Sequence, residues 1–164
     1  MNAAESMKTV RSLFDQSNWR YEMGEDECVV VAGFHDQCGS FDITARIAES
    51  PACLFVLCRL PLSVPEPKRP MVSEALNRAN FARLVGFFEM DPATGRIYCR
   101  ASLPLDGAEL SIEQVAYVLA GVVQRTSAYH RAFARLVFAD DLSPAEVIAE
   151  VDLDERESDS SSAS

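Results

Sequence analysis

The chain has 164 residues, of which 48% are hydrophobic and 24% are charged, a composition typical of one folded domain with an ordinary apolar core. Its 25 acidic and 15 basic residues leave a net charge of −10, so the basic surface that nucleic acids and anionic membranes require is not expected. Both are therefore poor candidates as partners. The chain starts without a visible secretory signal, and its apolar runs are shorter than the roughly 20 residues that cross a bilayer, which predicts a cytoplasmic protein.

The first predicted element is an amphipathic helix over residues 3–17. Met7, Val10, Leu13 and Phe14 recur at spacings of three and four, which places them on one side of a helix. Two extended segments follow, "WRYEM" and "CVVVAGF", and the acidic segment "GEDE" between them favours a turn.

The next two segments have clear strand patterns. Residues 40–48 alternate apolar and polar side chains, as expected for a strand with one face in water. Residues 53–62, "CLFVLCRLPL", are apolar at almost every position, which indicates a strand with both faces covered. The segment "SVPEPKRP" that follows is rich in proline and is expected to form a loop.

A second helix is predicted from Pro70, because a proline suits the first turn and a stripe of small and aliphatic side chains follows it. Strands over residues 84–90 and 96–105 come next. The segment "DPATG" separates them and has the residue types of a tight turn, so the two strands are expected to form a β-hairpin.

The last predicted elements are two helices and a tail. Ser111 and Gln114 form a capping box for a helix over residues 112–138, on whose exposed face Arg125, Arg131 and Arg135 are expected. A short helix begins at Pro144. Residues 152–164 are acidic and serine-rich, which predicts a disordered tail after a single α+β domain over residues 1–151.

These elements predict the order α-β-β-β-α-β-β-α and an α+β fold with an antiparallel sheet. The segment "LNRAN" ahead of an apolar strand, the turn "DPATGRI" and "LPL" before a capped helix also resemble motifs of one family. On these motifs, residues 7–138 resemble the YbjN family, whose members are named as bacterial sensory transduction regulators. The resemblance implies a fold like that of type III secretion chaperones, a dimer, and no catalytic residues.

The strands carry apolar side chains on both faces. The residues expected to pack on the helices are Leu54, Val56, Leu84 and Phe88. The residues expected on the second face, as a protein interface, are Phe55, Leu57, Val85 and Phe87. Because exposed apolar patches usually mark an interaction site, this face requires cover, either from the long helix or from a homodimer or bound partner segment that buries about 800 Å² per side.

The polar side chains between the second helix and the following strand are a further candidate site. Asn80 is expected to hydrogen-bond to backbone where the helix ends, as short amide side chains often do. Asn77 and Arg83 are expected at the edge of a groove. None of the three has a nucleophile or a base beside it in the sequence, so no catalysis is predicted for them.

Metal and cysteine chemistry have weak support in the sequence. Cys28, His35 and Cys38 are zinc-ligand types, but a second close pair of ligands is missing, so no metal and no cofactor are predicted. His130, the other histidine, is expected on a helix surface. The sequence thus predicts a non-enzymatic, dimeric protein that binds protein or regulates. Two alternatives stay open: a type III secretion-type chaperone that binds an effector segment, and a small enzyme that uses Cys28, Cys38 or Cys58.

Overall fold

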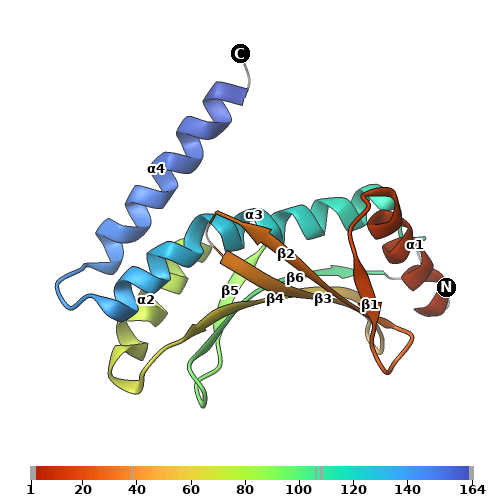
Figure 1. The fold of residues 1–164 in the computed structure, drawn as a ribbon, viewed down its shortest axis with the longest axis horizontal. Helices are drawn as coiled ribbons and strands as arrows, with labels where there is room; N and C mark the ends of the chain where they lie inside the picture. The colour runs from red at the N-terminus through yellow and green to blue at the C-terminus, as the bar shows by residue number, and fades with distance from the viewer. Residues whose placement is uncertain (1–2, 38, 106, 108, 163–164) are drawn as a thin grey trace.

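An antiparallel sheet with its helices on one side forms the fold in the computed structural model, which describes residues 3–37, 39–105, 107 and 109–162 (Figure 1). In chain order the elements are α1 (Ala3–Gln16), β1 (Tyr21–Met23), β2 (Val29–Asp36), β3 (Gly39–Glu49), β4 (Ala52–Ser63), a 3-10 turn (Glu66–Lys68), α2 (Arg69–Asn80), β5 (Phe87–Met90), β6 (Arg96–Pro104), α3 (Ile112–Phe138) and α4 (Pro144–Ser162).

The strand order across the sheet is β1-β2-β3-β4-β6-β5, and each neighbouring pair is antiparallel. This confirms the α+β class and the predicted order of elements, in which β1 corresponds to the extended segment "WRYEM" and α4 to the helix predicted to begin at Pro144. The hairpin of β5 and β6 and the capping box of Ser111 and Gln114 are also present as predicted.

One face of the sheet carries the core. Leu54, Val56 and Cys58 of β4 alternate with exposed or half-buried residues and are fully buried under the helices. Helix α3 packs on β4 and β6, α1 packs on β3 and α3, and α2 packs on β5 and α3. The covered face therefore belongs to three helices that all lie on the same side (Figure 1).

The other face, which we call the open sheet face, is covered by no helix in the described part of the chain. Phe55 and Leu57 of β4 point to this side and are half-buried, and Phe87 of β5 is 43% exposed. The sequence left two possible covers for this face, the chain's own long helix or a second protein chain. The long helix, α3, lies on the opposite face, so it does not cover the open sheet face.

The strand predicted over residues 84–90 begins later, at Phe87. The backbone turns at Ala82 (φ 58°) and Gly86 (φ 73°), so the segment between them is a loop. Leu84, predicted on the helix side of a strand, is 90% exposed in this loop. Val85, predicted on the second face, instead packs towards α3, where its side chain approaches Gly121. Both placements from the sequence are wrong, and the turn at Gly86 is the reason.

The disordered tail over residues 152–164 stays a prediction, and the structure continues α4 to Ser162. This segment is poor in apolar residues, but two of its acidic side chains have partners. Asp152 and Glu155 pair with Arg83, which lies in the loop before β5, and this long-range contact is not visible in the local composition.

Candidate functional site

The open sheet face is built by one set of alternate residues from every strand. The registers of neighbouring strands place five residues in one row across it: Phe87, Arg100, Leu57, Thr44 and Val31. Because side chains directly opposite each other on one face lie within contact range, the row forms a continuous strip. Its two ends, Phe87 and Val31, are 43% and 41% exposed, which is high for side chains of this size.

Polar side chains interrupt this row: Arg100 lies between Phe87 and Leu57, and Thr44 lies between Leu57 and Val31. Arg100 pairs with Glu89 at 3.1 Å and Arg59 pairs with Asp42 at 3.0 Å, and all four side chains are substantially exposed. Exposed pairs of this kind contribute at most about 1 kcal/mol to stability. Protein-binding surfaces combine apolar and polar side chains, and the open sheet face has both.

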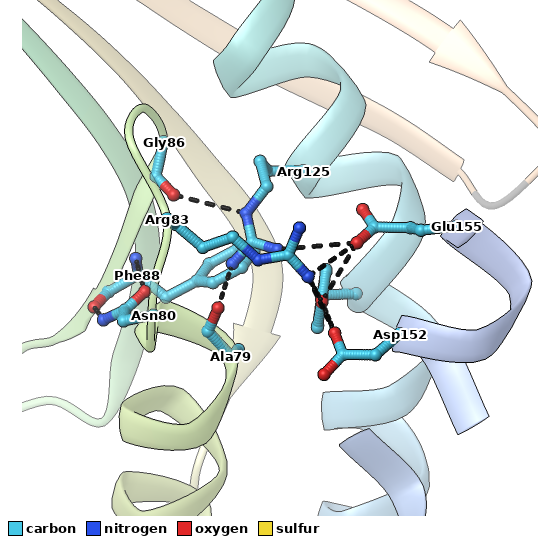
Figure 2. A network of polar contacts seen from close by, with 9 residues as sticks. Ala79, Asn80, Arg83, Gly86, Phe88, Arg125, Asp152 and Glu155 are labelled. Atoms are coloured by element: carbon cyan, nitrogen blue, oxygen red, sulfur yellow. Dashed lines mark hydrogen bonds and ion pairs between the residues drawn. The ribbon is translucent and has the colours of Figure 1, made fainter. Parts of the chain in front are cut away.

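A second polar feature lies on the helical side, where Arg125 of α3 is buried (Figure 2). Arg125 donates to the backbone oxygens of Ala79 at 2.5 Å and Gly86 at 3.3 Å. Its guanidinium lies 4.1 Å from the ring centre of Tyr129 and 5.0 Å from that of Phe88. Arg125 thus ties the end of α2 and the loop before β5 to α3, and its prediction as an exposed residue is wrong.

Arg83 extends this network towards α4 (Figure 2). Its Nη2 donates to Asp152 at 2.7 Å, to Glu155 at 2.8 Å and to the Tyr129 hydroxyl at 2.8 Å. Partial burial opposes the charge of Arg83, but Tyr129 and the two carboxylates outweigh it, so the pKa of Arg83 is raised. Burial, together with the hydrogen bond that the Tyr129 hydroxyl donates to Asp152, raises the pKa of Tyr129. The network therefore consists of two permanent cations, a neutral phenol and two acids.

Asn80 makes the backbone contact predicted for it. Its amide nitrogen donates to the Phe88 oxygen and its amide oxygen accepts from the Phe88 nitrogen, both at 2.8 Å. The Asn80 side chain therefore hydrogen-bonds to the backbone groups of Phe88 that point away from β6. Asn77 is exposed and lies beside a groove between α2 and α4, and Arg83 lies beside a cavity between α3 and α4. Their role in binding stays a prediction.

The sequence missed Arg125 and Tyr129 as members of a site. A signal was present, since Val118, Val122, Arg125 and Tyr129 follow one another at spacings of four, three and four and so share one side of α3. An arginine inside an apolar stripe is rarely buried without partners. Its partners come from α2 and from the loop before β5, which the helix pattern alone does not identify.

His130 is a poor catalytic base in this structure. Its Nδ1 is buried and has no hydrogen-bond partner, and burial lowers the pKa of the ring. The hydroxyl of the nearby Ser127 donates to Asp36. Because a nucleophile and its base must share a hydrogen bond that a third group orients, Ser127, Asp36 and His130 do not form a catalytic triad.

In the described part of the chain, the candidate zinc ligands do not form a metal site. His35 Nδ1 lies 2.9 Å from the Ser40 hydroxyl in the turn between β2 and β3. Across the described ranges, no three His, Cys, Asp or Glu side chains are grouped so that they could hold a metal ion. Cys38, one of the candidates, lies outside those ranges.

The described cysteines are free, and those on β4 and β6 are buried. Burial raises the pKa of Cys58 to about 11 and that of Cys99 to about 12. Because the thiolate is the nucleophile, about one Cys58 side chain in a thousand is reactive at pH 8. Burial and the neighbouring Asp26 also raise the pKa of Cys28, so none of these thiols is activated.

We therefore expect Cys58 and Cys99 to resist alkylation in the folded protein. Iodoacetamide at pH 8, followed by mass spectrometry of each cysteine peptide, measures the rates. Both residues should react far more slowly in buffer than in urea, where burial is lost. Rapid labelling of Cys58 in the folded protein would support the cysteine-dependent enzyme instead.

Comparison with known families gives one match. The model of the YbjN family, described as "Putative bacterial sensory transduction regulator", covers residues 6–135. The match includes the sheet, α2 and nearly all of α3, and it ends before α4. A search of curated proteins finds no match.

Two solved structures share the fold. A chain of the HopA1–SchA chaperone–effector complex is 14% identical with a TM-score of 0.56, over 80% of this chain and 98% of that chain. A chain of the ExsC–ExsE complex is 15% identical with a TM-score of 0.51, over 82% of this chain and 95% of that chain. These similarities confirm the predicted chaperone-like fold. In the described part of the chain, every helix is too short or too polar to cross a membrane.

Proposed function

This chain belongs to the YbjN family, and on that basis we propose that it is a non-enzymatic, dimeric protein of the cytoplasm that binds protein in a regulatory role. The observation that carries the proposal is the open sheet face. Its apolar side chains have no cover from the described helices and lie among exposed charged pairs. The proposed interface residues are Phe55, Leu57 and Phe87, without Val85, which packs on α3.

A second copy of the chain is the proposed occupant of this face. Phe87 and Val31 stand at the two ends of the strip, with Leu57 between them, so the strip crosses the sheet from β5 to β2. A standard interface buries about 800 Å² per partner, so the proposed contact extends beyond this row to the neighbouring rows of the open sheet face, which include Phe55. The free, buried thiols of Cys58 and Cys99 suit the reducing compartment that the proposal assigns.

A chaperone role is the second candidate, and a specific observation favours it. One of the solved structures with this fold is a chain of a chaperone–effector complex. In this alternative the open sheet face, or the groove beside Asn77, holds an extended or helical segment of a client protein. The acidic surface of this chain, with its net charge of −10, would favour a basic or amphipathic client.

Light scattering at micromolar concentration tests the dimer. We expect a mass of twice 18.1 kDa. A mass of 18.1 kDa at every concentration up to the millimolar range would contradict the dimer, and the open sheet face would then need another occupant.

Co-purification from the native cell separates the two roles. A dedicated chaperone should retain one client at a fixed stoichiometry through a salt wash, whereas a regulator that acts as a homodimer should be recovered without one. The Phe87→Asp variant serves as the matched control, since a client held by the open sheet face should be lost from it.

A further inference from the structure

Helix α4 docks on the rest of the fold through two small sets of contacts. Near its start, Val147 and Ile148 are buried against the core. One to two turns later, Asp152 and Glu155 pair with Arg83 (Figure 2). These four residues lie within nine positions, and their spacings place them on one side of the helix. The docked part of α4 is thus an aliphatic pair followed by an acidic pair.

The surface that receives the acidic pair is assembled by other elements. Arg125 is held by the backbone of Ala79 and Gly86, and the Tyr129 ring lies beneath its guanidinium. Neither contact involves α4. Arg125 is only 5% exposed, and its Nη1 has no hydrogen-bond partner while it faces the Glu155 carboxylate at 3.9 Å. A buried cationic nitrogen without an acceptor is costly, so this position favours an anion.

Helix α4 does not fill the space around this surface. A cavity of about 850 Å³ lies between the loop before β5, α3 and Glu155, and Leu84 at its border is 90% exposed. The side chains of Arg83, Asp152 and Glu155 each keep between 26% and 34% of their surface in water. The cavity has an apolar side, which includes Val85 and Val123, and a cationic side, which includes both arginines. A ligand that covered both would fit it better than α4 does.

The position of α4 in the chain also indicates that it is separate from the domain on which it docks. The family match ends at residue 135, so the surface of Arg83, Arg125 and Tyr129 lies inside the matched domain and α4 lies outside it. The five residues between α3 and α4 form a short connection, and α4 extends away from the sheet beyond its docked part (Figure 1). The helix therefore resembles a ligand attached to the domain by a linker.

We propose that Arg83, Arg125 and Tyr129 form a carboxylate-binding site for an acidic amphipathic helix, which α4 occupies within the chain and a helix of a partner protein can replace. The partner helix would present an aliphatic pair followed, four to eight residues later, by two carboxylates three residues apart. It would also cover Leu84 and the cavity that α4 leaves open. This site lies on the helical side, so it does not depend on the proposal for the open sheet face.

A labelled peptide with the sequence of residues 142–159, which contains the docked part of α4, is the probe. Fluorescence anisotropy measures its binding to the full-length chain and to a full-length variant with Asp152→Asn and Glu155→Gln. In the variant the attached helix competes less well, so we expect the peptide to bind at least about tenfold more tightly than to the unmodified chain. The variant changes only partly exposed acids, which favours its folding.

Two controls make the result specific. A peptide with the same two acids changed to amides should bind the variant at least about tenfold more weakly, and this comparison requires no further change to the protein. Adding Arg83→Gln to the variant should weaken the binding of the acidic peptide by the same factor. Equal binding of the acidic and amide peptides, or no binding of either to any form of the protein, would overturn the proposal.

Discussion

Replacing Arg125 with methionine is expected to lower the free energy of unfolding by about 2–5 kcal/mol, far more than the loss of an exposed arginine. The variant leaves the backbone oxygens of Ala79 and Gly86 without their donor, and each unpaired buried group costs about 1–3 kcal/mol. The contacts of the guanidinium with Phe88 and Tyr129 are lost as well. Methionine regains some packing because its length is similar.

Urea unfolding followed by circular dichroism measures this change. Arg135→Met is the matched control on the same helix, because Arg135 is 47% exposed and pairs with the exposed Glu150. Arg135→Met should lower the free energy of unfolding by no more than about 1 kcal/mol. Equal effects of the two exchanges would show that the buried network of Arg125 does not hold α2, α3 and the loop before β5 together.

Replacing Phe87 with aspartate is expected to weaken the proposed dimer by about a hundredfold or more, the effect of losing an aromatic residue that carries much of an interface's binding energy. The aspartate would also bring an unpaired charge into the contact. Because Phe87 is already 43% exposed in the single chain, the exchange should change the free energy of unfolding of the monomer little. Light scattering at micromolar concentration should then give the mass of one chain.

Phe138→Asp is the control for this prediction. Phe138 is 81% exposed at the end of α3, on the helical side, so it has the same residue type on the opposite side of the molecule. This variant should remain a dimer. Dissociation by Phe138→Asp but not by Phe87→Asp would move the interface from the open sheet face to the helices.

Much of the fold could be predicted from local patterns. The alternation in residues 40–48, the turn segment between β5 and β6, and the capping pair of Ser111 and Gln114 each depend on a few neighbouring residues. The apolar run of β4 predicted a strand with both faces covered, whereas the described helices cover one face. This apolar segment alone does not indicate which helix packs on which face, because that depends on the path of the whole chain.

The wrong placements of individual residues have two physical causes. One is contacts between charged side chains and groups far away in the sequence, and the other is the local backbone geometry. The helix pattern places Arg125 in solvent, yet it is buried, because its acceptors come from residues 39 and 46 positions away. Asp152 and Glu155 of α4 pair with Arg83, about 70 positions earlier, a contact that the local composition did not indicate. Leu84 and Val85 differ from their predicted places because the left-handed backbone of Gly86 starts the strand later. None of these contacts has a signature within one element.

Hydroxyl-radical footprinting tests the central claim, that the open sheet face is where this protein meets a partner, because it reports the exposure of individual aromatic side chains. The chain is oxidised at nanomolar and at tens of micromolar concentration, and each peptide is quantified. Phe87 and Tyr98 of the open sheet face should be protected at the higher concentration, while Tyr117 and Phe138 of α3 should react equally at both. Unchanged oxidation of Phe87 together with protection of Tyr117 or Phe138 would contradict the claim.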